Sequence, residues 1–298
     1  MSSRLGSFAP AYDACLALAH THYENFPVAS RLLPAFMRPH VAAVYAFARV
    51  ADDIADEGTD PPAARRTRLA AWQARLHEAV GDASIDRALG SRDALIIAAT
   101  GQSIRTLDLP LSLFDDLVSA FGQDITTTRY ASWADVHDYC RRSADPVGRL
   151  VLRIAGYRDE ALDRSSDALC TALQLTNFWQ DFGRDFRAGR LYVPQEVAAR
   201  AGASEEDLAA GRWSTAWTQA MEECIATTRA GFERGRHVCS GVRGRLRFEL
   251  RLTWLGGSRI LDRVEHARTE LLHHRPTLGR ADVPALLWQA ARWGSVAA

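Results

Sequence analysis

The sequence of 298 residues contains no lysine, because all 36 of its basic residues are arginine. A primary amine is needed for Schiff-base chemistry, for a lysine general base and for the Walker A phosphate loop, so these three mechanisms are excluded. Arginine stays protonated at neutral pH. The basic side chains of this protein can therefore bind anions, but they cannot shuttle protons.

Long apolar runs, cysteine pairs and excess charge are also missing. No stretch approaches the roughly 18 apolar residues that would predict a membrane-spanning helix. The five cysteines include no CxxC pair, and the N-terminus has no signal-peptide pattern, which predicts buried free thiols in the cytoplasm. Because 36 acidic residues balance the 36 basic ones, the composition argues against nucleic-acid binding driven by phosphate neutralisation.

Strand-like alternation is almost absent, and helical signals dominate the chain. A short extended piece is expected at residues 189–194, and Ser132 with Asp135 resembles a capping box at a helix start. Helices are predicted over residues 39–57, 166–187 and 213–238, with a further helical pattern between 246 and 272 that Gly256-Gly257 breaks. With no repeat and no flexible linker, the pattern predicts one all-α domain over residues 1–298.

The helix predicted over residues 39–57 gathers its polar side chains on one narrow stripe. Successive side chains of a helix are rotated by about 100° around its axis. Counted from Tyr45, the side chains of Arg49, Asp52 and Asp56 fall within about 40°, and Asp53 lies at the edge of this stripe. The opposite side carries alanine and valine. This helix should therefore pack on its apolar side and present carboxylates and a cation on the other.

The helix predicted over residues 166–187 repeats this design. Asn177, Asp181 and Asp185 follow an i, i+4, i+8 spacing, with Gln174 and Arg184 close to the same face. Leucine and aromatic residues cover the remaining surface. Because the polar stripe is narrow and the aromatic surface is wide, we expect this helix to lie deep in the protein.

Two interpretations of these stripes are open. A pair of aspartates one turn apart on a single helix is most often a solvated face. Like charges at that spacing repel each other, however, and here two such arrays occur, each beside an arginine. Mg²⁺ prefers oxygen ligands, usually one or two carboxylates together with phosphates and water. Two facing acidic helices could therefore hold a diphosphate through metal ions.

The residues of both stripes resemble the motifs of a known enzyme family. The run from Tyr45 to Glu57 (YAFARVADDIADE) resembles the first aspartate-rich motif of squalene and phytoene synthases. The segments 174–185 (QLTNFWQDFGRD) and 189–194 (GRLYVP) resemble the second. Residues between these motifs also match, namely Asp124, Arg129-Tyr130, Tyr139-Cys140 and Val147-Gly148. The resemblance covers roughly residues 20–265.

This resemblance implies an all-α isoprenoid-synthase fold, a single helical domain around a central apolar cavity, and Mg²⁺-dependent chemistry on prenyl diphosphates. The metal ligands that it implies are Asp52, Asp53, Asp56, Asn177, Asp181 and Asp185. The substrate-binding residues that it implies are His22, Asn25, Phe26, Arg49, Asn177 and Arg190. The catalytic residues that it implies are Tyr45, Arg49 and Tyr192. For the histidine and the two tyrosines, ordinary partly buried packing explains the sequence equally well.

The middle segment indicates a branch of the family. Condensing members usually read Tyr-Cys-x-x-Val-Ala-Gly-x-Val-Gly there, and this chain departs from that pattern at Arg142, Ser143, Asp145 and Pro146. These departures, with the runs 22–30 and 254–262, resemble the hydroxysqualene synthase branch of bacterial hopanoid pathways. Such enzymes ionise presqualene diphosphate, rearrange the cation and let water capture it. Asp145 is a candidate for orienting that water, although an Asp-Pro pair that opens a helix is the commoner explanation.

Two other functions stay open at this stage. One is a head-to-head condensing prenyltransferase that makes presqualene diphosphate, squalene or phytoene, and the other is a non-catalytic helical assembly factor on the same scaffold. The implied ligand is a prenyl diphosphate. A lipid product would suit peripheral contact with the inner face of a membrane and association with other squalene-pathway enzymes, although no basic amphipathic helix is evident in the sequence.

Overall fold

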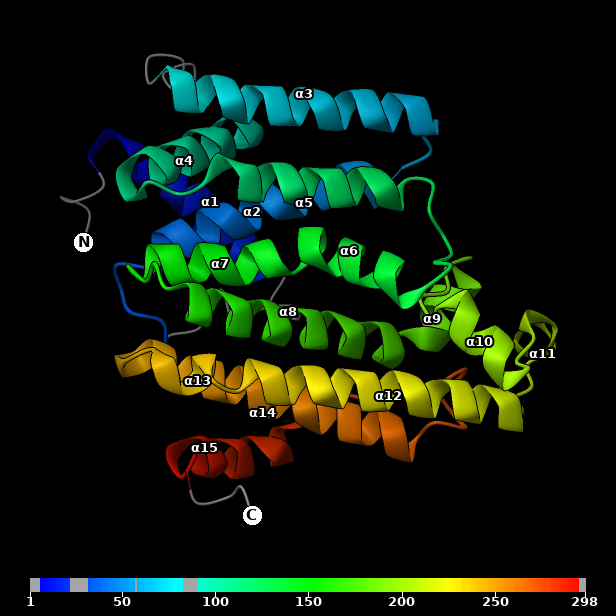
Figure 1. Ribbon diagram of the computed structural model, residues 1–298. Helices are drawn as coiled ribbons and strands as arrows, with labels where there is room; N and C mark the ends of the chain where they lie inside the picture. Colours follow the sequence, from blue (N-terminus) through cyan, green and yellow to red (C-terminus); the bar gives the residue numbers. More distant parts are fainter. Residues whose placement is uncertain (1–5, 22–31, 57, 83–90, 295–298) are drawn as a thin grey trace. The chain divides into compact units, whose positions relative to one another are not determined.

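The computed structural model describes residues 6–21, 32–56, 58–82 and 91–294, and this part of the chain is all-α. The first seven α-helices are α1 (Ala9–Thr21), α2 (Arg38–Asp56), α3 (Pro62–Gly81), α4 (Arg92–Leu107), α5 (Leu111–Asp124), α6 (Trp133–Ser143) and α7 (Asp145–Ile154). The other eight are α8 (Glu160–Gln180), α9 (Phe182–Arg187), α10 (Gln195–Ala201), α11 (Glu205–Ala209), α12 (Thr215–Gly235), α13 (Val238–Gly241), α14 (Gly244–His266) and α15 (Val283–Ala291). Two 3₁₀ turns, Gly6–Phe8 and Arg280–Asp282, complete the regular structure, and the described residues contain no strand beyond one isolated bridge. The predicted fold class is confirmed (Figure 1).

The chain divides into two compact units. Unit 1 comprises residues 1–126 and 146–159, and unit 2 comprises residues 127–145 and 160–298. The boundary falls after the first residue of α7, so that Asp145 belongs to unit 2 and the rest of this helix to unit 1. The interpretation of residues 1–298 as one domain stays a prediction.

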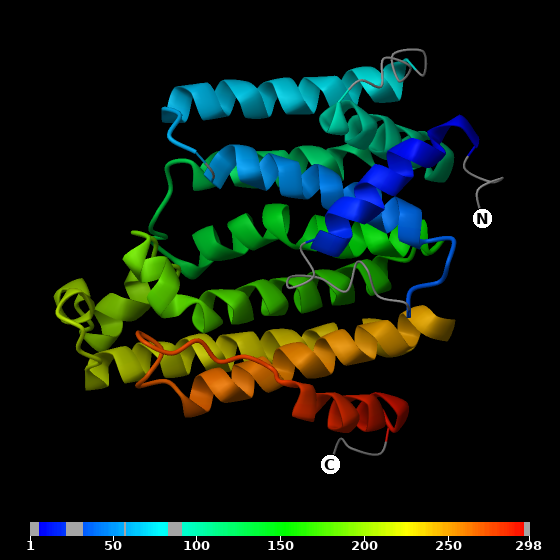
Figure 2. The ribbon, with the colours of Figure 1, turned by 180° about the vertical axis from the view of Figure 1, so that it is seen from behind.

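In unit 1, α2 is the central helix. It packs against α1, α3, α4 and α5, and Figure 2 shows α1 lying across it. Alanine, valine, isoleucine and Phe47 fill the sides of α2 that face these neighbours. Phe47 stacks on Trp72 of α3, with ring centroids 5.5 Å apart, and meets Phe114 of α5 edge-on. A helix that is enclosed on most sides by small and branched apolar residues is held rigidly, and α2 is therefore a firm base for its polar stripe.

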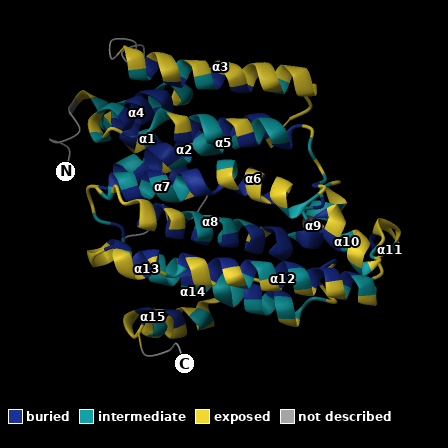
Figure 3. Ribbon diagram, in the orientation of Figure 1, coloured by how far each residue is buried: buried dark blue, intermediate teal, exposed yellow. Residues whose placement is uncertain are grey.

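In unit 2, α8 has the central place. It packs against α6, α12, α13 and α14, and Figure 3 shows it buried along much of its length. Trp179 is fully buried and donates from Nε1 to Oγ1 of Thr228 in α12 at 2.8 Å. The expected depth of this helix is confirmed. Its aromatic side anchors it, because a buried indole N–H needs the partner that α12 supplies.

Several local predictions are confirmed and two are wrong. Ser132 and Asp135 form the predicted capping box at the start of α6, and none of the five cysteines is in a disulfide, four of them being buried and Cys170 half-buried. Gly256-Gly257 does not break a helix, since α14 runs through both residues. A side chain at Gly257 would collide with those of Leu173 and Phe232, so this glycine allows close helix packing. No described helix combines the length and the hydropathy that a membrane crossing requires.

The second wrong prediction is the unbroken helix over residues 166–187. Two helices occupy that region. The first, α8, begins at Glu160 and ends at Gln180, and the second, α9, begins at Phe182. Asp181 lies between them with φ −94° and ψ 8°. Hydrogen bonds continue across the break, from the Asp181 N–H to the Asn177 carbonyl at 2.8 Å and from the Asp185 N–H to the Asp181 carbonyl at 2.9 Å. The polar spacing therefore survives, while the backbone changes at the central aspartate.

Candidate active site

The first candidate group of residues is the polar stripe of α2 in unit 1. Tyr45, Arg49, Asp52 and Asp53 are half-buried and Asp56 is exposed, whereas nearly all other residues from Pro39 to Ala55 are buried. This burial pattern confirms that the spacing places the polar side chains together on the least covered side of the helix. Within the stripe, Arg49 is the cation that lies beside the carboxylates.

Arg49 pairs with two of the three aspartates on α2. Its Nη2 lies 2.5 Å from Oδ1 of Asp53, and its Nη1 lies 3.6 Å from Oδ2 of Asp52. Burial lowers the pKa of Arg49, but the charges of Asp53 and Asp52 outweigh it, so that the pKa shifts upward and the cation persists. Burial also raises the pKa of Tyr45, which keeps its phenol neutral. The arginine thus offsets the repulsion between neighbouring carboxylates that the sequence predicts.

The second candidate group lies on α8, α9 and the following loop in unit 2. Asn177 is exposed near the end of α8, Asp181 is half-buried at the break, and Asp185 is half-buried in α9. The Arg190 N–H donates to the Asp185 carbonyl at 2.8 Å, which closes the turn after α9. One amide and two carboxylates are therefore offered at intervals of about one helical turn.

Arg275 contacts a predicted site residue, and no pattern in the sequence predicts this contact. Its Nε donates to Oδ1 of Asp181 at 2.5 Å, and its Nη2 donates to Oδ2 at 3.2 Å, so the guanidinium binds the carboxylate through two bonds. The two residues lie 94 positions apart in the chain. No helical or strand period connects residues at such a distance, and the only local signal is the Arg-Pro pair that ends a helical pattern.

The segment that carries Arg275 is fixed against α8 and α9. Gln180 donates from Nε2 to the Pro276 carbonyl at 2.6 Å, and Arg187 donates from Nη1 to the Leu272 carbonyl at 2.6 Å. Gly183 lies directly beneath this segment, and a Cβ at that position would meet the carbonyl oxygens of Leu271 and Leu272. The segment therefore rests on backbone where only glycine fits.

Tyr192 stands in an aromatic cluster of unit 2 that also contains Tyr130, Tyr139 and Phe178. Its ring stacks on that of Phe178, with centroids 3.7 Å apart and planes 4° from parallel. Tyr130 stacks on Tyr192 at 5.8 Å and meets Tyr139 edge-on at 5.6 Å, and Tyr139 lies 6.5 Å from Tyr192. Four rings from three separate segments thus converge, those of Tyr130, Tyr139 and Phe178 buried and that of Tyr192 half-buried. An aromatic ring that is accessible attracts cations without offering a strong nucleophile.

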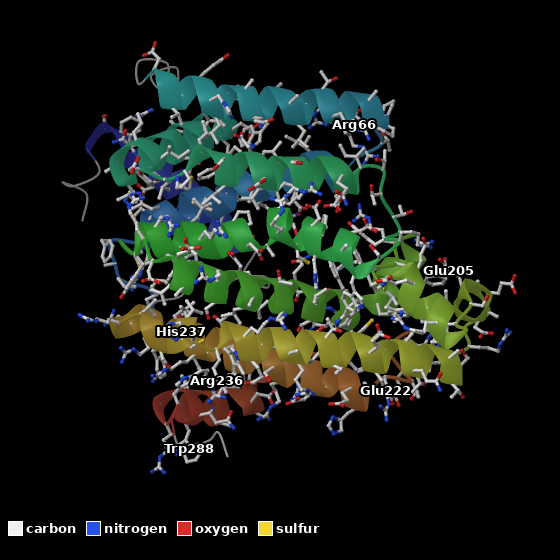
Figure 4. The ribbon with its side chains drawn as sticks, viewed as in Figure 1. Arg66, Glu205, Glu222, Arg236, His237 and Trp288 are labelled. Atoms are coloured by element: carbon white, nitrogen blue, oxygen red, sulfur yellow. The ribbon has the colours of Figure 1, made fainter. Side chains whose placement is uncertain are left out.

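The extended piece that carries Tyr192 is held by a network around Arg129. Leu191 and Arg129 form the isolated parallel bridge, and the guanidinium of Arg129 donates to the Gly189 carbonyl at 2.7 Å. The same guanidinium binds Glu205 of α11, a residue labelled in Figure 4, through Nε at 2.8 Å and Nη2 at 2.7 Å. The predicted extended piece over residues 189–194 is confirmed, and Arg129 ties it to the segment before α6.

Asp145 is 9% exposed, and its Oδ1 accepts a 2.8 Å hydrogen bond from Oγ1 of Thr171 in α8. The helix α7 begins at this residue, with Pro146 in its second position. The buried carboxylate is therefore both the first residue of a helix and a link to α8. A role in water orientation stays a prediction.

The remaining predicted site residues divide between described and undescribed parts of the chain. His22, Asn25 and Phe26 lie outside the described residues. Asp52, Asp53 and Asp56 lie in unit 1, whereas Asn177, Asp181 and Asp185 lie in unit 2. Within the described ranges, no three His, Cys, Asp or Glu side chains gather into a group that could hold a metal ion by themselves. All six predicted ligands nevertheless offer oxygen, the donor that Mg²⁺ takes beside phosphate and water.

Comparison with known proteins gives a consistent result. The family model for squalene/phytoene synthase matches residues 19–282. The chain is 37% identical to a hydroxysqualene synthase of Sinorhizobium fredii over 76% of this chain and 74% of that protein. It is 36% identical to a hydroxysqualene synthase of Zymomonas mobilis over 74% of this chain and 71% of that protein. The crystal structure of squalene synthase HpnC from Alicyclobacillus acidocaldarius matches with a TM-score of 0.78 and 37% identity, covering 89% of this chain and 95% of that one.

Proposed function

This chain belongs to the squalene/phytoene synthase family, and on that premise we propose that it converts presqualene diphosphate and water to hydroxysqualene and diphosphate. The similarity to hydroxysqualene synthases over about three quarters of the chain supports this branch. The observation that carries the chemistry is that both aspartate arrays are present, one on the central helix of unit 1 and the other from the end of α8 into α9, each with an arginine paired to one of its aspartates. A scaffold without catalysis would have no reason to keep these like-charged rows.

The six oxygen-donor residues would hold the metal ions and the diphosphate that they bind. They are Asp52, Asp53, Asp56, Asn177, Asp181 and Asp185. Mg²⁺ at such ligands supplies positive charge that stabilises a departing diphosphate. Carboxylates alone would repel that anion, so the proposed site depends on cations.

Arg49 and Arg275 supply the protein's own positive charge in this proposal. Each already binds an aspartate of an array, Arg49 through Asp53 and Arg275 through Asp181. A guanidinium has five N–H donors, so it can keep a carboxylate contact and also donate to a phosphate oxygen. We propose that both arginines, together with Arg190, bind the diphosphate as it leaves.

In this proposal the tyrosines stabilise the carbocation that is left when the diphosphate departs. Tyr192 is the half-buried member of the cluster that it forms with Phe178, Tyr130 and Tyr139, and aromatic rings stabilise cations by roughly 0.5–2 kcal/mol. Tyr45 stays neutral because burial raises its pKa, so it offers a weak nucleophile. We propose that these side chains line the reacting end of the substrate and delay the entry of water until rearrangement is complete.

A product assay tests this function. The full-length protein is incubated with Mg²⁺, NADPH as a hydride donor and one of three substrates, presqualene diphosphate, farnesyl diphosphate or geranylgeranyl diphosphate, and the lipid is identified by mass spectrometry. We expect hydroxysqualene from presqualene diphosphate and no turnover of farnesyl diphosphate. Release of squalene or presqualene diphosphate from farnesyl diphosphate, or of phytoene from geranylgeranyl diphosphate, would instead identify a condensing enzyme. No turnover of any of these substrates would favour a non-catalytic helical scaffold.

The ion pair between Arg275 and Asp181 makes a prediction about metal dependence. In Arg275→Gln, the carboxylate loses its competing cation, so the Mg²⁺ concentration for half-maximal activity should fall about threefold, while kcat falls about tenfold because a phosphate ligand is lost. Arg268→Gln is the matched control, since Arg268 pairs with one carboxylate, that of Glu222, at 2.7 Å on the same unit. Equal Mg²⁺ profiles for the two variants would contradict the proposed exchange of partners.

A further inference from the structure

The helix α15 is apolar on its outer side as well as on its packed side. Leu286 and Ala290 are buried, but Val283, Leu287 and Trp288 are 49%, 41% and 54% exposed. Figure 4 shows Trp288 on the side of α15 that points away from α14. The helix (VPALLWQAA) contains one polar residue, Gln289, and no charge. A peripheral helix of this composition is expected to contact something apolar.

The side chains of α15 are held firmly from beneath. Trp293, directly after the helix, donates from Nε1 to Oγ of Ser240 in α13 at 3.1 Å. The guanidinium of Arg236 lies between two indoles, 5.3 Å from the ring centroid of Trp254 and 5.0 Å from that of Trp293. Arg251 donates to the Ala290 carbonyl at 3.3 Å. The C-terminal end of α15 is therefore fixed to unit 2, and the outer side chains of this helix are exposed although the helix is packed in place.

The chain that supports α15 is strongly basic. Residues 234–248, which span the end of α12, α13 and the start of α14, contain five arginines and one histidine and no acidic residue. The next acid, Glu249, is buried. The arginines are Arg234, Arg236, Arg243, Arg245 and Arg247, and Arg292 adds a further cation above the ring of Trp288 at 5.0 Å. Although the formal net charge of the protein is +0, arginine is thus concentrated beside an exposed apolar helix.

The apolar helix and the neighbouring arginines together favour one of two possible partners, a second copy of this chain or an anionic lipid surface. In a symmetric dimer the same patch meets itself, so the arginines of two copies would face one another. An anionic lipid surface instead offers negative phosphates to the arginines and an apolar layer to the leucine, valine and tryptophan side chains. Tryptophan is also the side chain best suited to the boundary between headgroups and acyl chains.

We propose that α15, together with the basic segment 234–248, docks this protein on an anionic membrane surface. Val283, Leu287 and Trp288 enter the boundary between headgroups and acyl chains, while the arginines bind lipid phosphates. The contact rests on unit 2 alone and is independent of the proposed reaction. It goes beyond that reaction by fixing which face of the protein meets the bilayer, where an apolar product could leave water.

Vesicle flotation with the full-length protein and no substrate tests the docking surface. Vesicles of phosphatidylcholine alone are compared with vesicles that contain about one third phosphatidylglycerol, and binding should be confined to the latter and weaken at high salt. The double variant Leu287→Ser with Trp288→Ser should bind about tenfold more weakly. Arg245→Glu, at an exposed residue of the basic segment, should bind at least about fivefold more weakly.

Matched controls lie in unit 1. Phe36→Ser removes another exposed large apolar side chain, 58% exposed, and Arg92→Glu makes the same charge change at an exposed arginine. Both should bind vesicles as the wild type does, and all four variants should keep the unfolding temperature within a few degrees. Equal vesicle binding by all variants would overturn the proposal. It would also fail if anionic vesicles bound nothing while the wild type formed a dimer that the double variant could not form.

Discussion

Replacing Asp181 by asparagine is expected to lower kcat by about a hundredfold to a thousandfold and to leave the fold intact. Asparagine keeps the shape and one oxygen of the side chain, but it removes the negative charge that a metal–diphosphate complex requires. The ion pair of Asp181 with Arg275 is partly exposed, with 20% of the aspartate side chain and 44% of the arginine side chain accessible. Such pairs contribute about 1 kcal/mol or less to stability, so the unfolding temperature should change little.

The matched pair for this experiment is Asp52→Asn in α2 and Asp207→Asn in α11. Asp52 belongs to the other array, so its variant should lose activity to a similar extent. Asp207 pairs with Arg212 at 2.7 Å and belongs to neither array, so its variant should turn over substrate as the wild type does. Turnover is measured at saturating Mg²⁺ and substrate. Activity near that of the wild type in both Asp52→Asn and Asp181→Asn would mean that the stripes are ordinary solvated helix faces.

Asp52 and Arg275 show which site residues the sequence could predict and which it could not. The stripe on α2 is encoded in a local period, because a helix repeats every 3.6 residues and the positions of Tyr45, Arg49 and Asp52 follow from that geometry alone. The contact of Arg275 with Asp181 depends on where the chain returns after α14. No period in the sequence encodes that return, so tertiary structure was needed to find it.

The glycines give a second example. Gly256-Gly257 has the composition of a helix break, yet it lies within α14, because Gly257 makes room for Leu173 and Phe232. Glycine costs about 1 kcal/mol in a helix, an amount that tertiary packing can outweigh. The break that does occur, at Asp181, has no proline, and its nearest glycine, Gly183, lies within α9. Local propensity thus located the helices and their caps, whereas packing determined where they are interrupted.

Replacing Gly183 by alanine is expected to destabilise unit 2 and to impair the candidate site together. A Cβ on Gly183 would lie 2.5 Å from the carbonyl oxygen of Leu271 and would also meet that of Leu272, and backbone atoms cannot move aside as a flexible side chain can. The segment that carries Arg275 would have to lift from α9, which would weaken the 2.6 Å bonds from Arg187 and Gln180. Overpacking of this kind typically costs about 1–3 kcal/mol, and lost hydrogen bonds add to that cost.

The matched control is Gly122→Ala in α5, where a Cβ would meet only the side chain of Leu69 at an ordinary 3.6 Å. Alanine is the better helix former by about 1 kcal/mol, so this variant should be neutral or slightly more stable. If the two variants differ by about 3 kcal/mol, thermal unfolding should separate them by about 6–12 °C, given a shift of about 2–4 °C per kcal/mol for a domain of this size. Because Arg275 is displaced, Gly183→Ala should also lose turnover at temperatures where it remains folded. If both variants unfolded at the same temperature, the segment after α14 would not be seated on α9, and Arg275 could not be assigned to the site.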